Sequence, residues 1–261
     1  MTTRPSVMIT GASMGIGAAY ADRFAKRGHD LVLVARNHDL MELLAERLRV
    51  ETGVTVDVLK SDLTNSADLA NVEQRLRDDS RIGVLINNAG TAAKGSFAEQ
   101  TPDDVAQVIN LNTIALARLA SAVTPRFVKQ GAGSIVNIAS VVAFGPEFGL
   151  TVYGATKAFT LFLTQGMHHE LAPKGIYVQA VLPAATRTKI WEHSGIDINA
   201  LPAVMEVDEL VDAALTGYDR RETVTIPPLA DISQWEAYEA ARITMRPGFA
   251  HTQAAKRYKS A

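Results

Sequence analysis

Short apolar segments alternate with longer segments of helical periodicity along most of the chain. The short segments are rich in β-branched residues and lie near residues 6–10, 30–35, 54–60, 82–87, 133–139, 175–182 and 223–226. They form nearly continuous apolar runs, which are typical of strands covered on both faces in a parallel sheet. The pattern therefore predicts an α/β fold: a doubly wound, mostly parallel seven-stranded sheet with helices on both faces.

Glycine and proline residues mark where the predicted elements end. Gly28 and Gly53 are expected to end the first two helices, and Gly175 precedes a strand. Two prolines at 227 and 228 stop the last strand. We therefore expect one domain over residues 1–226, followed by a C-terminal extension over residues 227–261 that packs on the same domain or on a partner subunit.

Composition narrows the range of partners. The chain has 261 residues, of which 47% are hydrophobic, enough for one sizeable core. Its formal net charge of -2 creates no general attraction to nucleic acid or to an anionic membrane, so neither partner is expected. The chain contains no cysteine, which excludes disulfides, thiolate metal ligands and a cysteine nucleophile. We predict no metal site.

The first residues and the lengths of the apolar runs indicate where in the cell the protein is expected. The first residues pass directly from a short polar lead into a strand-like run, without the pattern of a secretory signal. No apolar run is long enough to span a bilayer. The expected location is the cytoplasm.

A glycine-rich segment joins the first predicted strand to the first predicted helix. Its spacing is Gly-x-x-x-Gly-x-Gly, which lets the backbone turn tightly and bring amide groups against a pyrophosphate. This spacing differs from the commoner G-x-G-x-x-G, and taken alone it also suits an ordinary strand-to-helix turn. The cofactor contacts expected here are Gly11, Ser13, Met14, Gly15, Ile16 and Gly17.

The end of the second predicted strand indicates which dinucleotide is bound. An acidic residue at this point would hold the ribose 2′-hydroxyl of NAD, but the chain has Ala35 followed by Arg36. An arginine can bind a 2′-phosphate through charge-assisted hydrogen bonds, although a lone arginine at a strand end is more often simply solvated. We predict NADP(H) as the cofactor, preferred over NAD(H).

Two further segments fit the adenosine half of such a cofactor. Asp62 follows the third strand and is positioned to accept a hydrogen bond from the adenine amine, with a helix cap or turn as an equal alternative. The sequence Asn-Asn-Ala-Gly at 87–90 closes the fourth strand, and its small residues would let the ribose approach the backbone. Taken alone, that sequence is merely a good turn. The expected contacts are Asp62, Leu63, Asn88, Ala89 and Gly90.

Tyr153 and Lys157 lie four residues apart in a predicted helix, so their side chains share one face. A phenol with a pKa near 10 is a poor acid–base catalyst at neutral pH. A nearby ammonium and an oxidised nicotinamide would both favour the phenolate and lower that pKa. We predict that Tyr153 exchanges the proton, while Lys157 lowers its pKa and donates hydrogen bonds to the nicotinamide ribose.

Two polar residues complete the candidate site. Ser140 ends the fifth strand and is placed to polarise a substrate carbonyl, or else it bonds its own backbone. Asn112 stands among apolar residues of a helix and would hold a water linked to Lys157, with a satisfied structural amide as the alternative. The absence of Gly-x-Ser-x-Gly, and of a histidine or carboxylate next to Ser140 in sequence, argues against a hydrolase.

Together these motifs resemble the short-chain dehydrogenase/reductase family over about residues 7–188, in the family's order. The resemblance implies a Rossmann-type fold and a catalytic tetrad of Asn112, Ser140, Tyr153 and Lys157, with the roles given above. It also implies that the segment 183–188 lies beneath the nicotinamide. The contacts implied there are Pro183, Thr186 and Thr188, in addition to Tyr153 and Lys157.

Three positions depart from the family's pattern. Met14 stands where many NADP-preferring members carry a basic residue, which leaves Arg36 as the main ligand of the 2′-phosphate. Ala184 replaces a usual glycine, and Thr186 replaces a common valine or isoleucine. The resemblance further implies a homodimer or homotetramer, assembled through the helices that carry Asn112 and Tyr153.

These features predict an NADP(H)-dependent oxidoreductase that transfers a hydride between nicotinamide and a carbonyl or secondary alcohol. The alternative is an NADPH-binding sensor without catalytic activity, which the intact tetrad argues against. A lyase or epimerase is a third possibility, disfavoured because the chain is short for the added substrate domain of such proteins.

Apolar residues near the catalytic positions suggest the class of substrate. The segments after Ser140 and after Thr188 both leave the carboxyl edge of the sheet and are expected to face each other. Their apolar side chains would form the walls of a pocket that suits a neutral, predominantly hydrophobic ketone or alcohol. Residues 189–201 are expected to move as a lid over the bound substrate. The predicted pocket residues are Phe144, Phe148, Ile190 and Trp191.

Overall fold

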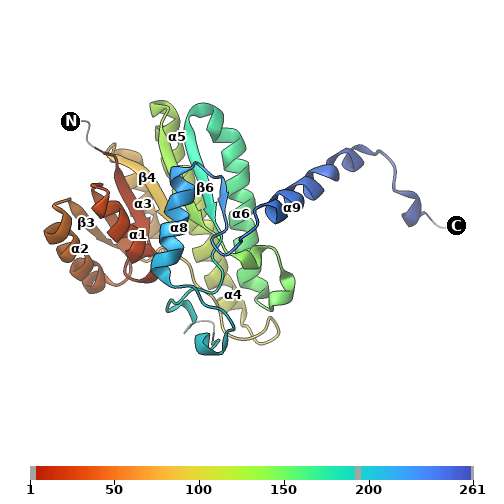
Figure 1. Ribbon diagram of the computed structural model, residues 1–261, viewed down its shortest axis with the longest axis horizontal. Helices are drawn as coiled ribbons and strands as arrows, with labels where there is room; N and C mark the ends of the chain where they lie inside the picture. The colour runs from red at the N-terminus through yellow and green to blue at the C-terminus, as the bar shows by residue number, and fades with distance from the viewer. Residues whose placement is uncertain (1–3, 192–194, 260–261) are drawn as a thin grey trace. The chain divides into compact units, whose positions relative to one another are not determined.

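The computed structural model describes residues 4–191 and 195–259, and Figure 1 shows its elements. The strands are β1 (Ser6–Thr10), β2 (Leu31–Ala35), β3 (Val56–Lys60), β4 (Ile82–Asn87), β5 (Gly133–Ile138), β6 (Ile176–Val181) and β7 (Val224–Thr225). They form one sheet in the order β3-β2-β1-β4-β5-β6-β7, and every pairing is parallel. The predicted seven-stranded doubly wound sheet is confirmed, and the sheet is entirely parallel.

The strand order reverses between β1 and β4. From β1 the chain winds outward to β2 and β3, then crosses back to β4 and winds the other way. The loops after β1 and β4 therefore part at the carboxyl edge, which is where open α/β sheets bind ligands.

Helices connect the strands and cover the sheet. The α-helices are α1 (Gly15–Lys26), α2 (His38–Thr52), α3 (Ser66–Asp78), α4 (Pro102–Ile109), α5 (Leu116–Gln130), α6 (Thr151–Leu171), α8 (Val207–Asp219) and α9 (Ser233–Thr244). One π-helical segment, η1 (Asn110–Ala115), continues α4 into α5. The short 3-10 segments are η2 (Val141–Ala143), η3 (Pro146–Phe148), η4 (Ala172–Lys174), η5 (Ile198–Ala200), η6 (Arg246–Ala250) and η7 (Lys256–Tyr258).

The sheet has an apolar core on each face. Apolar residues of α1, α2 and α8 pack on one side, and those of α3, α5 and α6 on the other. All five residues of β1 and all six of β6 are buried, as continuous apolar strands require. Gly53, in the left-handed region with φ 73°, ends α2 as predicted.

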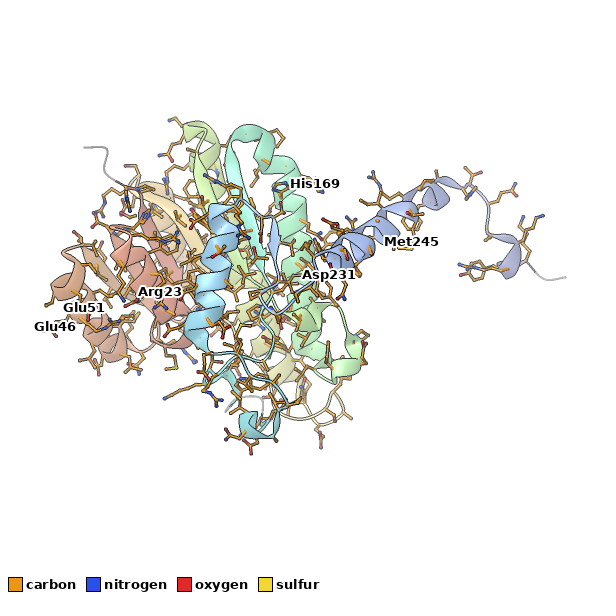
Figure 2. All side chains as sticks on the ribbon, viewed as in Figure 1. Arg23, Glu46, Glu51, His169, Asp231 and Met245 are labelled. Carbon is orange, nitrogen blue, oxygen red and sulfur yellow. The ribbon has the colours of Figure 1, made fainter. Side chains whose placement is uncertain are left out.

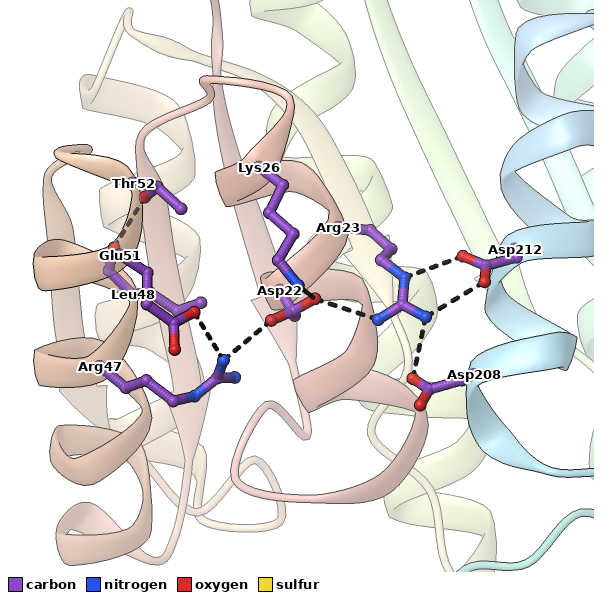
Figure 3. A network of polar contacts seen from close by, with 9 residues as sticks. All are labelled: Asp22, Arg23, Lys26, Arg47, Leu48, Glu51, Thr52, Asp208 and Asp212. Carbon is purple, nitrogen blue, oxygen red and sulfur yellow. Dashed lines mark hydrogen bonds and ion pairs between the residues drawn. The ribbon is translucent and has the colours of Figure 1, made fainter.

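A network of charged side chains ties α1 to α2 and α8 (Figure 3). Asp22 on α1 is bound by Lys26 at 2.8 Å and by Arg47 of α2 at 3.0 Å. Burial alone would raise the pKa of Asp22, but hydrogen bonds from three cations hold it below its ordinary value. Arg23 also reaches α8, contacting Asp212 at 2.8 Å and Asp208 at 3.0 Å. This network joins three helices that pack on one face of the sheet.

Exposed charged residues cover the outer helices. Glu46 and Glu51 are both exposed on α2 (Figure 2), and Glu51 pairs with Arg47 at 2.9 Å. No helix in the described part of the chain is long and apolar enough to cross a membrane.

The chain divides into two compact units, one ending at Pro227 and the other beginning at Pro228. In the second unit, Trp235 and Tyr238 of α9 stack with ring centroids 5.6 Å apart. None of the described residues of this unit is buried. Whether it packs on its own domain or on a partner subunit stays a prediction.

Candidate active site

A cavity of about 770 Å³ lies at the carboxyl edge of the sheet. Loops that follow six of the seven strands, β1 through β6, contribute to its lining. Elements far apart in sequence therefore meet here because parallel strands present their carboxyl ends on one edge.

The glycine-rich turn forms one wall of this cavity. Gly11 has φ +65° and Gly15 has φ +57°, values that side chains disfavour. A Cβ on Gly11 would lie 2.8 Å from Asn88 Nδ2, and one on Gly17 would lie 2.3 Å from the Gly11 carbonyl oxygen. Gly17 thus lets α1 pack closely on the turn but does not line the cavity. Its predicted contact with the cofactor stays a prediction.

The N-terminus of α1 is well suited to hold an anion. Its N-cap, Met14, makes no capping hydrogen bond, and no acidic residue occupies the first turn. By contrast, α2 and α3 are capped by the side chains of Asn37 and Asn65. The backbone amides that open α1 therefore face the cavity without a capping side chain, as a pyrophosphate would require.

Hydrogen bonds join the glycine-rich turn to the end of β4. Thr10 Oγ1 accepts hydrogen bonds from the backbone amides of Asn88 and Ala89, each at 3.0 Å. Asn88 Nδ2 donates to the carbonyl oxygens of Thr10 at 2.9 Å and Gly11 at 3.2 Å. The Asn88 amide thus holds the turn in shape, and the small residues Ala89 and Gly90 line the cavity beside it.

Arg36 lies at the end of the cavity formed by β2 and β3. It is exposed and makes no hydrogen bond or ion pair with the described residues. Asn37, His38 and Thr64 also line this end, although no sequence motif marks them. The arrangement leaves a guanidinium and several hydrogen-bonding groups available to a phosphate.

Asp62 takes part in a turn as well as lining the cavity. Its Oδ1 accepts from the backbone amide of Thr64 at 2.9 Å and from the Thr64 hydroxyl at 2.7 Å. These bonds lower the pKa of Asp62, so the carboxylate stays charged. The turn role is therefore present, and an adenine contact would use the remaining acceptor positions.

Tyr153, Lys157 and Ser140 meet at the opposite end of the cavity. Tyr153 and Lys157 share one face of α6, with Lys157 Nζ 5.5 Å from the centre of the Tyr153 ring. Lys157 is buried, and its Nζ donates to the Ile138 carbonyl oxygen of β5 at 2.8 Å. Ser140 donates to the Pro183 carbonyl oxygen at 3.2 Å. The expected self-contained serine turn is also present, since Ser140 Oγ accepts from the Val142 amide at 3.4 Å.

Burial shifts both titratable groups toward their neutral forms. It raises the pKa of Tyr153 to about 12, while a hydrogen bond with the Ser140 side chain acts in the opposite direction. It lowers the pKa of Lys157 to about 8. In the protein by itself the pKa of Tyr153 is thus raised rather than lowered, because the effect of burial outweighs that of the hydrogen bond with the Ser140 side chain.

Asn112 lies within the π-helical segment η1 and is buried. Its Nδ2 donates to the Thr91 carbonyl oxygen at 2.9 Å and to Thr156 Oγ1 at 3.0 Å, and its Oδ1 accepts from the Thr91 amide at 2.9 Å. Both amide protons are used, so the side chain behaves as the satisfied structural amide. Asn112 does not line the cavity, and its water relay stays a prediction.

The segment after β6 forms another wall of the cavity. A Cβ placed on Gly15 would lie 3.4 Å from Thr188 Cγ2, so Thr188 faces the start of α1. Trp191 Nε1 donates to the Thr186 carbonyl oxygen at 2.7 Å, which holds the indole at the wall. The residues of this segment that line the cavity are Pro183, Ala184, Ala185, Thr186, Thr188, Lys189, Ile190 and Trp191.

The predicted apolar pocket is placed only in part. Ile190 and Trp191 line the cavity, but Phe144 and Phe148 do not, and Phe148 is 56% exposed. The loop turns through η2 and η3 and carries both phenylalanines off the cavity. Apolar walls come instead from Leu111, Val142 and Leu150, which no sequence motif marks. Of the predicted lid, residues 192–194 lie outside the described residues.

No group of three or more histidine or acidic side chains suited to a metal occurs among the described residues.

The sequence model of the short chain dehydrogenase family matches residues 5–198. The chain belongs to this family. Among characterised relatives, the very-long-chain 3-oxoacyl-CoA reductase of Mus musculus is 33% identical over 187 residues, and that of Bos taurus is 34% identical over 194 residues. Each match covers 70% of this chain and 60% of the relative, so the matched part spans about 60% of the length of these relatives.

Solved structures resemble the chain over nearly its whole length. A short-chain dehydrogenase from Sphingobium yanoikuyae, in complex with NADPH, is 63% identical with a TM-score of 0.97, covering 98% of this chain and 100% of that one. The bulky-bulky ketone specific alcohol dehydrogenase from Comamonas testosteroni is 57% identical with a TM-score of 0.94, covering 99% and 100%.

Proposed function

We propose that this protein is an NADP(H)-dependent oxidoreductase that interconverts a neutral, hydrophobic ketone and its secondary alcohol. The observation that carries this proposal is one continuous cavity with Arg36 at one end and Tyr153, Lys157 and Ser140 at the other. The Sphingobium neighbour in complex with NADPH supports the choice of cofactor.

The residues present fit the proposed cofactor. The uncapped start of α1 and the glycines at 11 and 15 suit a pyrophosphate, and Arg36 suits a 2′-phosphate. Lys157 Nζ lies close to Gly90, 3.6 Å from where its Cβ would stand, and so reaches the side of the cavity where the nicotinamide ribose would lie. When bound, the cofactor supplies or accepts the hydride.

The protein's own residues manage the proton. In ketone reduction the Tyr153 hydroxyl donates its proton to the developing alkoxide, and in alcohol oxidation the tyrosinate accepts it. Ser140 gives up its bond to Pro183 and donates to the same substrate oxygen. Lys157, while protonated, stabilises negative charge on the phenol oxygen.

The apolar wall supports a hydrophobic substrate. Leu111, Val142, Leu150, Ile190 and Trp191 line the cavity near the catalytic residues. Glu147 would repel an anionic substrate if its carboxylate lay inside the cavity, but this residue is exposed. The Comamonas neighbour is described as specific for bulky-bulky ketones, so we extend the proposal to ketones with two large substituents.

A matrix of two cofactors and several ketones tests the proposal. Initial rates with NADPH and NADH would be measured for small, bulky apolar, and charged ketones. We expect the highest kcat/KM for NADPH with a bulky apolar ketone. A protein that binds NADPH but turns over no carbonyl or alcohol would instead support the sensor alternative.

An apolar surface favours assembly into a homodimer or homotetramer. Ile109 and Ile114 of α4 and η1 are 39% and 45% exposed, and Phe159 and Phe162 of the adjacent α6 are 41% and 76% exposed. Exposed apolar groups of this size mark an interface. Light scattering of the native chain and of Phe162→Glu tests this, with dissociation expected for the variant. A cytoplasmic location is part of the same proposal, and cell fractionation tests it.

A further inference from the structure

The face of α6 that packs on β5 is unusually polar. Thr156, Thr160 and Thr164 recur at every fourth residue on this face and are 3%, 0% and 0% exposed. Tyr153 and Lys157 share it by the same spacing. The helix that carries the proposed proton donor is therefore joined to the sheet through hydroxyl groups as well as through apolar contacts.

A chain of hydrogen bonds runs from the sheet into this face. Asn87 of β4 and Asn137 of β5 are directly paired across the two strands. Asn87 Nδ2 donates to Asn137 Oδ1 at 3.0 Å, and Asn137 Nδ2 donates to Thr164 Oγ1 at 2.9 Å. The Thr164 hydroxyl then donates to the Thr160 carbonyl oxygen at 2.6 Å. The side chains that form this series of hydrogen bonds, those of Asn87, Asn137 and Thr164, are almost completely buried.

A second connection lies two turns away along the same helix. Lys157 Nζ donates to the carbonyl oxygen of Ile138, the residue that follows Asn137 on β5. Adjacent residues of one strand thus hold α6 at positions 157 and 164. A helix held at one point can pivot about it, whereas two directional bonds fix both its rotation and its position along the axis.

The near end of α6 is held from a third direction. Asn112 of η1 donates to Thr156 Oγ1 at 3.0 Å, and the Thr156 hydroxyl donates to the Tyr153 carbonyl oxygen at 2.7 Å. The turn bearing Tyr153 is therefore braced by η1, while Asn137 braces the helix beyond it.

The network carries a cost that packing alone does not explain. Asn87 Oδ1 is buried without a hydrogen-bond partner among the described residues, because Nδ2 is turned toward Asn137 and the Leu116 carbonyl oxygen. Apolar contacts would avoid this penalty, but they are not directional. The polar arrangement gives up stability and gains a defined placement of the helix.

We propose that Asn137 and Thr164 are positioning residues for proton transfer, because their hydrogen bond sets the placement of α6 that directs the Tyr153 hydroxyl and Lys157 into the cavity. This inference rests on the proposed function for its catalytic readout. Neither residue lines the cavity, so neither touches substrate or cofactor.

Thr164→Val is the central variant, because it keeps the shape of the side chain and removes the hydroxyl that Asn137 binds. We expect kcat for ketone reduction to fall roughly 10-fold, with KM for the ketone and for NADPH changed less than about 2-fold. The pH profile of kcat should shift as well, since a displaced α6 changes the burial of Lys157 and its hydrogen bond to the Ile138 carbonyl oxygen of β5. Thr164→Ser keeps the hydroxyl and should restore both the rate and the profile.

Thr160→Val is the matched control within the same helix. Its hydroxyl donates to the Thr156 carbonyl oxygen at 3.0 Å and makes no hydrogen bond to the sheet among the described residues, so its loss should leave kcat and the pH profile unchanged. Equal losses in Thr160→Val and Thr164→Val, or a Thr164→Val protein with lower Tm but native kcat and pH profile, would overturn the proposal.

The double variant Asn137→Leu with Thr164→Val covers the case in which Thr164→Val does not fold. Removing both partners leaves an apolar contact, so folding should recover while the low kcat persists. Native kcat in the double variant would contradict the proposal. So would failure of every variant lacking the bond to fold, because the bond would then be merely structural.

Amide hydrogen exchange separates this inference from the proposed function. If the native protein reduced no ketone, the proposed function would fail, but exchange would still report on α6. We expect faster exchange near residues 153–157 in Thr164→Val and native exchange there in Thr160→Val. Native exchange in both variants would overturn the positioning role.

Discussion

The cofactor end and the substrate end of the cavity are built in different ways. At the cofactor end, backbone turns do most of the work: positive φ at Gly11 and Gly15, the uncapped start of α1, and the Thr10 hydroxyl that holds β4. At the substrate end, side chains from α6, from η1 and from the loops after β5 and β6 converge. The first end depends on local conformation, whereas the second depends on how distant elements are placed.

This difference teaches which substitutions should be tolerated. A change in the backbone turns should disturb binding of the dinucleotide as a whole, whereas a change at the substrate end should affect one chemical role at a time. The expected effects below run from the largest to the smallest, and each separates the two ends.

Tyr153→Phe should affect the chemistry alone. It removes the transferable proton, so we expect kcat for ketone reduction to fall by about 10³-fold or more, with the Kd for NADPH changed less than about 3-fold. Stopped-flow or steady-state rates and a fluorescence titration with NADPH provide the two numbers. A variant that retains most of its activity would refute the proton role of Tyr153.

Lys157→Ala should affect both ends, because Lys157 reaches the tyrosine ring and the side of the cavity near Gly90. We expect a loss of roughly 10²-fold in kcat together with roughly 10-fold weaker NADPH binding. Lys157→Arg serves as the charge-preserving comparison. Unchanged NADPH affinity in Lys157→Ala would remove the ribose role.

Arg36→Ala should affect the cofactor end alone. A charge-assisted bond to a 2′-phosphate contributes about 1.5–3 kcal/mol, so the preference for NADPH over NADH should fall by roughly 10- to 150-fold. The rate with saturating NADPH should stay near native. Ala35→Asp should lower the same preference through repulsion, and an unmutated enzyme that prefers NADH would contradict the assignment.

The pH dependence should differ between the two directions of reaction. Since burial lowers the pKa of Lys157 to about 8, its charge is lost as the pH rises through that value rather than near 10. Ketone reduction should therefore decline by about 5-fold between pH 8 and pH 9 and by about 50-fold between pH 8 and pH 10, while Tyr153, with a pKa of about 12, stays protonated. Alcohol oxidation needs the tyrosinate and should continue to rise.

This pH dependence is measured as initial rates of ketone reduction and alcohol oxidation at saturating substrate, from pH 6 to pH 10. Lys157→Ala supplies the control, because it should lack the decline above pH 8. A decline that persists in this variant would have another origin.

Trp191→Ala should give the smallest effect, confined to the shape of the substrate end. We expect kcat/KM for a bulky apolar ketone to fall roughly 5- to 20-fold, with less than about 2-fold change for a small ketone. Phe148→Ala is the matched control, because Phe148 is exposed and off the cavity. A larger loss in Phe148→Ala than in Trp191→Ala would reverse the assignment of the wall.

Most residues that the sequence predicted at the cofactor end line the cavity, and Gly17 is an exception. Spacing identified the glycine as part of the turn, but its contact with the Gly11 carbonyl oxygen depends on how α1 approaches that turn. Asp62 was recognised with two alternatives, and its bonds to Thr64 establish the turn role. Local motifs carry this information because the backbone conformation they specify is itself the site.

The substrate end was less predictable from the sequence, because it depends on how elements far apart in the chain pack together and not on local backbone conformation. Tyr153 and Lys157 were placed together correctly because one helix holds both, and the fourfold spacing of a helix is local. Phe144 and Phe148 do not line the cavity, since η2 and η3 turn their loop away from it. Leu111, Val142 and Leu150 went unnoticed, because apolar residues carry no motif and their direction is set by packing.

By itself, the sequence determined the parallel sheet, the glycine-rich turn and the spacing of the catalytic side chains, because each follows from short-range periodicity or backbone sterics. The tertiary structure decided which apolar residues line the cavity, the shifts of the Tyr153 and Lys157 pKa values that burial causes, and the polar contact of α6 with β5. These properties depend on burial and on neighbours far away in sequence, and neither is set until the strands and helices have packed together.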